Sequence, residues 1–160
     1  MFRSLDRSPF ITIFPFGLIA LLLCAGCSQK PSWQVEVHPA KGTCWINGEP
    51  AHRAKMIWFS KNGPIDKRET IPHAIVQEDG TFQVTTYEEN DGVPEGEYDV
   101  ILYWLDNPWE AKAADRLRGR YGKPESPLKT ITIVPGENEL EPIDLNVPGL
   151  LPADENASPY

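Results

Sequence analysis

The sequence predicts an all-β domain, a sandwich of about seven short strands with one short inserted helix, because two patterns recur along the chain. From Trp33 onward, apolar residues alternate with polar ones, which is the period of a strand with one buried face. The alternating segments are separated by turn-forming pairs, of which Asn47-Gly48 and Asp79-Gly80 are the strongest hairpin signals. The 16 prolines also argue against long helices, since proline lacks the amide that a helix interior needs.

The longest alternating segment follows Gly96, and its apolar residues fall on both faces. We therefore expect a central strand, or a strand whose second face is covered. The residues that define the expected strands are, in chain order, Val35 and Val37; 44–46; Ala54, Met56 and Trp58; 74–77; Phe82, Val84 and Thr86; Tyr98, Val100, Leu102 and Trp104; Ile131 and Ile133; and Leu140, Ile143 and Leu145.

One segment breaks the strand period and predicts a helix of about three turns. Residues 107–110 (Asn-Pro-Trp-Glu) are typical of a helix start, because asparagine caps free amides and proline fits the first turn. Ala113, Ala114 and Leu117 share one side of this helix, and Gly119 can end it.

The first residues of the chain are expected to be an export signal. Arg3 and Arg7 precede an uncharged apolar run of fourteen residues, 10–23. A helix that spans a bilayer needs roughly 20 apolar residues, and Pro15 and Gly17 weaken this run further. The run therefore indicates a signal peptide and not a permanent membrane helix.

The signal ends in Leu-Cys-Ala-Gly-Cys, residues 23–27, which resembles the bacterial lipobox. In lipobox proteins the last cysteine receives diacylglycerol and becomes the mature N-terminus, so the resemblance implies lipidation at Cys27. Cys24 departs from the pattern, since leucine is usual at that place. Ser28 follows the acceptor instead of aspartate, which by the same resemblance implies the outer membrane. The alternative is ordinary signal cleavage and a freely soluble protein.

These features predict four parts of the chain. Residues 1–27 are the lipoprotein signal peptide, 28–33 a short tether, 34–147 the β-sandwich, and 148–160 a polar, proline-bearing and flexible tail. The mature protein is expected in the cell envelope, lipid-anchored, on the periplasmic or the surface face of the outer membrane.

Three stretches of the sandwich carry a family resemblance. They are 37–58, with its Asn-Gly-Glu-Pro turn, 78–82 (Glu-Asp-Gly-Thr-Phe) and 94–98 (Pro-Glu-Gly-Glu-Tyr). Together they resemble the opening, the D-G-x-F turn and the P-x-G-x-Y strand start of the carboxypeptidase regulatory-like domains. The resemblance implies a Greek-key sandwich of the transthyretin-like, immunoglobulin-like kind.

Four further motifs resemble small lipoproteins of the planctomycete type: 115–117 (Asp-Arg-Leu), 119–121 (Gly-Arg-Tyr), 126–128 (Ser-Pro-Leu) and 136–140 (Gly-Glu-Asn-Glu-Leu). The order and spacing of all these motifs cover roughly residues 35–146. The resemblance implies the fold and export, since that family has no established common activity.

The charge of the chain argues against nucleic acid as a partner. The formal net charge is −8, and removal of residues 1–27 leaves 13 basic and 22 acidic residues, a charge of −9. A surface this acidic repels phosphate backbones.

No catalytic set or cofactor motif is expected. The chain contains no H-E-x-x-H, G-x-S-x-G, phosphate-binding Gly-Lys loop or paired C-x-x-C. One transthyretin-like enzyme of purine breakdown carries a C-terminal Tyr-Arg-Gly-Ser motif, whereas this chain ends in Asn-Ala-Ser-Pro-Tyr. The sequence therefore predicts a protein that is not an enzyme.

No metal site is expected either. His38, His52 and His73 lack ligand spacing, and the acidic loop 88–92 lacks the alternating order of calcium ligands, so a solvated turn is favoured. Cys44 stands where the resembled family has a core valine, so we expect a buried residue without a disulfide partner.

The tryptophans are the best indication of a binding face. Trp58 and Trp104 fit inward positions, whereas partly exposed rings are typical of carbohydrate or protein recognition. The predicted binding face consists of Trp33, Trp45, Trp109, Arg120 and Tyr121.

The sequence thus favours a membrane-anchored, non-enzymatic binding or structural module whose partner is an envelope protein or polysaccharide. The alternative is an accessory ligand- or metal-ion-binding lipoprotein that uses the acidic loop and the nearby histidines.

Overall fold

A computed structural model describes residues 30–105 and 114–152 of the chain. The chain divides into two compact units, Met1–Lys30 and Pro31–Tyr160. The described part of the second unit contains strands and no helix, which confirms the all-β prediction. The strands are β1 (Ala40–Ile46), β2 (Glu49–Pro50), β3 (Lys55–Ser60), β4 (His73–Ile75), β5 (Thr81–Gln83), β6 (Gly96–Tyr103), β7 (Lys129–Ile133), β8 (Asn138–Glu139) and β9 (Ile143–Leu145).

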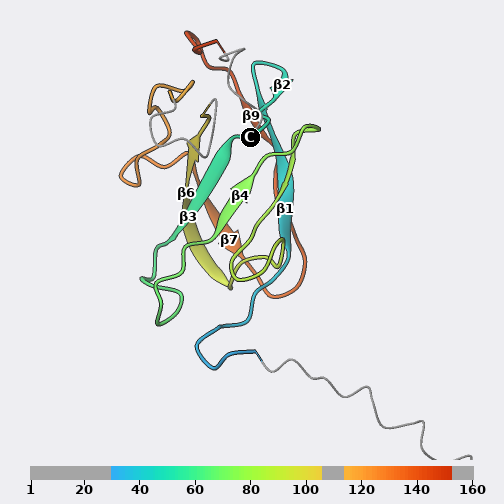
Figure 1. The fold of residues 1–160 in the computed structure, drawn as a ribbon, viewed down its shortest axis with the longest axis vertical. Coiled ribbons are helices and arrows are strands. Elements are labelled where there is room, and N and C mark those ends of the chain that lie inside the picture. The colour runs from blue at the N-terminus through green and yellow to red at the C-terminus, as the bar shows by residue number, and fades with distance from the viewer. Residues whose placement is uncertain (1–29, 106–113, 153–160) are drawn as a thin grey trace, which may run out of the picture. The chain divides into compact units, whose positions relative to one another are not determined.

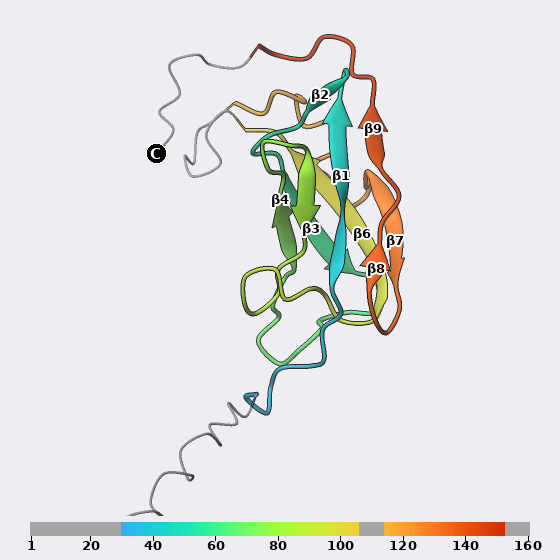
Figure 2. The same cartoon turned by 90° about the vertical axis from the view of Figure 1, so that its right-hand side faces the viewer.

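The first sheet is built around β1, which has partners along both of its edges (Figure 2). In its first half, Lys41 lies between Gln83 of the antiparallel β5 and Glu139 of the parallel β8. In its second half, Trp45 lies between Pro50 of the hairpin partner β2 and Asp144 of the parallel β9. Each of the other four strands of this sheet therefore pairs with β1.

The second sheet is antiparallel, in the order β4-β3-β6-β7 (Figure 1). Strand β6 lies inside the sheet, between β3 and β7, which confirms the prediction of a central strand. At the β4 edge, His73 exchanges two backbone hydrogen bonds of 3.0 and 2.8 Å with Thr85, which follows β5. This bridge links the two sheets along one side.

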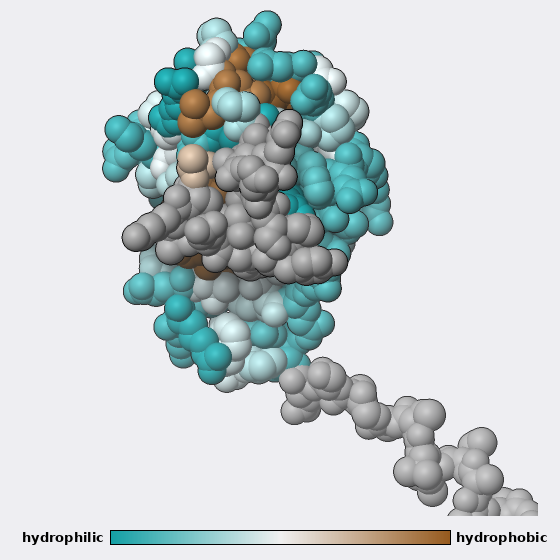
Figure 3. Space-filling model, turned by 45° about the horizontal axis from the view of Figure 1, so that its top comes forward, coloured by the Kyte–Doolittle hydropathy of each residue, from teal (hydrophilic) through white to brown (hydrophobic). Residues whose placement is uncertain are grey.

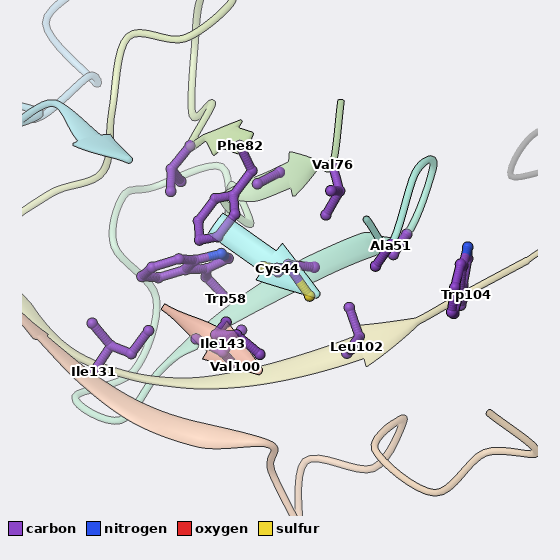
Figure 4. Packing of buried hydrophobic residues seen from close by; sticks show 14 of the residues in the cluster. Cys44, Ala51, Trp58, Val76, Phe82, Val100, Leu102, Trp104, Ile131 and Ile143 are labelled. Carbon is purple, nitrogen blue, oxygen red and sulfur yellow. The ribbon is translucent and has the colours of Figure 1, made fainter. Parts of the chain in front are cut away.

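Side chains from both sheets meet in a single apolar core (Figure 4). Trp58 and Trp104 are 0% and 4% exposed, which confirms their predicted inward positions. The Trp58 indole nitrogen has no hydrogen-bond partner, and no other buried side-chain nitrogen or oxygen of the described residues lacks one. The core residues labelled in Figure 4 are Cys44, Ala51, Trp58, Val76, Phe82, Val100, Leu102, Trp104, Ile131 and Ile143.

Both predicted hairpin turns are present. Asn47 and Gly48 have φ angles of 54° and 81°, the left-handed pair that a two-residue turn between β1 and β2 requires. Gly80 has a φ of 83° in the turn before β5, where its amide donates to the Gln77 carbonyl over 3.1 Å. Asn47 also exchanges side-chain hydrogen bonds of 3.1 and 2.7 Å with the backbone of Val147, so this turn holds the segment after β9.

The expected first strand around Val35 and Val37 is wrong. The segment before β1 is irregular, with a single antiparallel bridge between His38 and Val93. Two features explain the difference: the Val35 amide donates to the Tyr87 hydroxyl over 3.3 Å, and Pro39 has no amide for a strand ladder.

The predicted helix is not found among the described residues. Residues 107–113 lie outside them, and 114–121 form one bridge and a series of turns. The Asp115 carboxylate accepts hydrogen bonds from the amides of Trp104, Leu117 and Gly119, at 3.0, 3.1 and 2.7 Å. A side chain that takes up these amides offers the backbone an alternative to a helix.

The first residues of the predicted tail, 148–152, contact the domain. Leu151 donates its amide to the Arg116 carbonyl over 3.1 Å and accepts from the Arg116 Nε over 3.0 Å. Leu150 also packs against the core. Residues 148–152 are therefore held on the domain, and 153–160 lie outside the described residues.

The burial of Cys44 predicts a loss of stability in alkali. Burial, with a further contribution from Asp144, raises the pKa of the Cys44 thiol to about 12. In the unfolded chain the pKa of a cysteine is about 8.5. The free energy of unfolding is therefore unaffected by this thiol below that pH, and it falls as the pH rises from there towards the pKa of the folded state, because only the unfolded chain loses the proton.

We expect the free energy of unfolding, measured by urea denaturation, to fall between about pH 8 and about pH 11, and to fall less steeply in Cys44→Ala. The same pH dependence in both chains would contradict the role of this thiol.

Candidate functional site

The chain joins the domain through a cluster of four side chains, which we call the junction cluster: Trp33, Asp66, Arg68 and Tyr87. The Trp33 ring meets the Tyr87 ring edge-on, with centroids 5.4 Å apart and planes at 85°. The Arg68 guanidinium lies over the Trp33 ring, 3.9 Å from its centroid. The Tyr87 hydroxyl donates to Asp66 over 3.0 Å and accepts from the Val35 amide. The segment before β1 is thus fixed to the β3–β4 loop (61–72) and to the loop after β5.

Asp66 organises the β3–β4 loop at the same time. Its carboxylate accepts from the amides of Arg68 and Thr70, at 2.7 and 3.2 Å. Slight burial alone would raise the pKa of Asp66, but the hydrogen bonds from Thr70, Arg68 and Tyr87 outweigh it and lower the pKa. Asp66 is therefore held as an anion, which suits an acceptor for the Tyr87 hydroxyl and for two backbone amides.

Two shallow hollows flank the β3–β4 loop and share residues 63–65 in their walls. The larger, about 360 Å³, is lined by Glu36, His38 and Tyr98 among others. The second, about 300 Å³, is lined by Trp58 and Ile71 among others. The Nδ1 atom of His38 accepts from the Gly136 amide over 3.3 Å, so this histidine takes part in holding the loop after β7.

The acidic loop turns one carboxylate inward. Asp91 accepts from the amides of Thr86, Tyr87 and Glu88 at 2.7, 3.0 and 3.0 Å. Its oxygens hold the loop together, as those of Asp66 and Asp115 do in theirs. In the described ranges, no three His, Cys, Asp or Glu side chains gather closely enough to hold a metal ion. The metal-binding alternative would therefore need ligands other than Asp91.

The domain has two distinct ends. The proximal end is the one where residues 30–39 join β1, together with the β3–β4 and β7–β8 loops, and the distal end carries β2, β9 and the segment 148–152 (Figures 1 and 2). Figure 3 brings the distal end forward and shows apolar surface among hydrophilic residues there.

The structure separates the residues of the predicted binding face. Trp33 lies in the junction cluster at the proximal end, half-buried under Arg68. Trp45 lies towards the distal end, where its ring covers Gly80 so closely that a Cβ there would come within 3.1 Å of it. Tyr121 packs against the core beside β6, its carbonyl accepting from the Leu102 amide over 2.9 Å, and Arg120 is exposed next to it. Cys27 and Trp109 lie outside the described residues.

A second aromatic–cation pair was not anticipated from the sequence. The Arg116 guanidinium lies 3.8 Å from the centre of the Trp104 ring, whose indole nitrogen donates to the His52 carbonyl over 2.9 Å. Arg116 also holds Leu151, so it joins β6 to the C-terminal segment. The sequence gives no signal of this contact, because Arg116 follows Trp104 by 12 residues and lies in a segment of turns with no regular period.

No protein-family model, curated protein sequence or solved structure matches the chain. Among the residues that the structure describes, no helix is long and apolar enough to cross a bilayer.

The geometry of Asp115 yields a testable expectation. Asp115→Asn keeps one oxygen but replaces the other with an amide nitrogen, so the amides of Trp104, Leu117 and Gly119 can no longer all find an acceptor. We expect a loss of about 1–3 kcal/mol in the free energy of unfolding, measured by urea titration.

Glu125→Gln, which neutralises an exposed carboxylate in the same loop, is the matched control and should change stability by less than about 0.5 kcal/mol. Equal effects of the two substitutions would show that charge, and not these hydrogen bonds, is responsible.

Proposed function

We propose that this protein is a lipid-anchored module of the cell envelope, non-enzymatic, whose β-domain binds or supports an envelope partner. The observation that carries the proposal is the junction cluster, read together with the leader. Trp33 is six residues after the cysteine of the lipobox-like sequence, and the structure fixes it against Arg68 and Tyr87. A domain fixed this close to its anchor has a defined orientation towards the membrane. A module that presents one surface to an envelope partner requires such an orientation.

We also propose that the two sheets form a Greek-key sandwich of the transthyretin-like kind. The consecutive strands β3, β4 and β5 are neighbours in space, through the ladder of β3 and β4 and the His73–Thr85 bridge, and β6 returns to lie beside β3. A fourth strand beside the first is the order that defines a Greek key.

A buried tyrosine supports the same fold type. Tyr98 lies near the start of β6, and its hydroxyl donates over 3.0 Å to the carbonyl of Pro94, four residues earlier in the chain. A tyrosine that bonds back to the backbone at the start of a strand is a feature of immunoglobulin-like sandwiches. Burial raises the pKa of Tyr98 to about 12, so this hydroxyl stays protonated as a donor.

The partner surface that we propose is the distal end, which faces away from the segment that leads to the anchor. The loop 114–128 lies at this end, where Arg116 binds Leu151 of the segment 148–152. Although the chain as a whole is acidic, this distal loop exposes Arg118, Arg120 and Lys123. The two guanidinium groups offer forked donors that match carboxylates. A carboxylate-bearing envelope polysaccharide or protein is the partner that fits this loop.

The anchor is tested by mass spectrometry of the mature N-terminus. We expect a peptide that begins at Cys27 and carries acyl chains, and we expect Cys27→Ser to leave the protein outside the membrane fraction, since stable anchoring requires acyl chains. An unmodified peptide that begins at or beyond residue 27 would defeat the lipid anchor.

The partner surface is tested by crosslinking in native envelopes. We expect one reproducible adduct, whose yield falls in the double variant Arg118→Gln/Arg120→Gln because the forked donors are lost. The control is Lys61→Gln/Lys67→Gln, which removes two exposed cations from the proximal end. If both double variants crosslink as well as the original chain, the distal loop is not the partner surface.

A further inference from the structure

Three large hydrophobic side chains of the described part of the domain stay exposed, and they lie at the same end. Among the described residues, the large hydrophobic side chains that stay exposed are Val35 (37%), Ile71 (49%) and Val134 (53%). They come from three segments far apart in the sequence: the segment before β1, the β3–β4 loop and the loop after β7. All three segments lie at the proximal end (Figures 1 and 2).

The pairings confirm this placement. Ser60, the last residue of β3, pairs with Tyr98 near the start of β6, and Gly96 pairs with Ile133 at the end of β7. The end of β3, the start of β6 and the end of β7 therefore lie at the same end of the sheet. The loops that follow β3 and β7 leave the sheet at that end. Val35 lines the same hollow as Ser60 and Gly96, and Ile71 lines its neighbour.

The chain outside the described residues limits what can face this end. Three residues separate Cys27 from Pro31, the first residue of the domain, and the four Cα–Cα steps between them span about 14 Å when fully extended. The junction cluster fixes the segment that follows. This step rests on the proposed lipid anchor: an acylated Cys27 keeps the proximal end within that short reach of the lipid headgroups.

We propose that the proximal end docks on the phospholipid surface, with the side chains of Val35, Ile71 and Val134 entering the interface. Three apolar side chains on three separate segments give three points of contact, so the domain is held in one orientation. Trp33 lies on the same end, and tryptophan is the residue type that membrane–water interfaces favour.

Charge decides the kind of lipid. The exposed acidic residues of this end outnumber its exposed basic residues, and anionic headgroups repel such a surface. The docking surface therefore fits zwitterionic headgroups. The exposed acidic residues are Glu36, Glu69, Glu88, Glu89, Glu95, Glu97 and Glu137, and the exposed basic residues are Lys30, Lys61, Lys67 and Arg68.

The test uses the full acylated protein in phosphatidylcholine vesicles, with a nitroxide label on one introduced cysteine: Val35→Cys, Ile71→Cys or Val134→Cys. The native cysteines do not interfere, because Cys44 is 0% exposed and Cys27 is acylated under the proposal. Glu49→Cys, an exposed position in β2 at the distal end, is the control. Flotation of the vesicles reports the anchor, and collision of the label with oxygen or with a water-soluble nickel complex reports its depth.

We expect all four proteins to float, and the three proximal labels to lose collisions with nickel and gain collisions with oxygen relative to the label at position 49. Replacing part of the phosphatidylcholine with phosphatidylglycerol should weaken this difference. If the protein floats and the proximal labels are as accessible to nickel as the control, the docking is wrong although the anchor holds.

Two other outcomes also overturn the docking. A protein that does not float shows that the anchor itself has failed. Protection of the proximal labels without vesicles, increasing with protein concentration, shows that a second copy of the chain covers this end.

Discussion

The fold depends on the pairing of β1 along both of its edges. Strands β2, β5, β8 and β9 all pair with β1, so a break in that one strand leaves four others without a ladder. Two of these partners, β8 and β9, run parallel to β1 and lie about a hundred residues further along the chain. The core depends on the same strand, since Ala40, Cys44 and Ile46 point from it towards the second sheet. Pairing across such sequence separations makes a fold slow to form, because the loop must close before the contacts exist.

Carboxylates turned towards their own backbone shape the connections between strands. Asp66, Asp91 and Asp115 each accept three hydrogen bonds, nearly all from amides of their own loops. Asn138 does the same after β7, where its side chain bonds the backbone of Val134 and Gly136. These short polar side chains satisfy amides that no strand or helix pairs, which lets long irregular loops stay ordered. A chain rich in acidic residues thus uses some of them as structural groups, and its negative surface charge is only part of their effect.

The sequence predicted most strands because alternation reports directly on a half-buried sheet, as in Phe82 and Val84 or Tyr98 and Val100. It predicted the Asn47-Gly48 turn because left-handed φ angles restrict residue type. It failed at Val35 and at residues 114–119, where a tyrosine hydroxyl and the Asp115 carboxylate bind amides that a regular element would use. It could not find the junction cluster, since Trp33, Arg68 and Tyr87 meet only through the tertiary fold. Nor could it show that Trp33 and Trp45 lie towards different ends, because exposure patterns carry no information on position along a strand axis.

The late position of β9 in the chain has a consequence for the export that we propose. A polypeptide that passes through a translocon unfolded and amino-terminus first delivers β1 well before β9, which ends at Leu145. Until β9 is present, one edge of β1 has no partner along Cys44, Trp45 and Ile46, and the core lacks the side chain of Ile143. The native sheet therefore cannot be complete until residues 143–145 have been synthesised. Under the proposed export, this topology would keep the chain unfolded until it has crossed the membrane.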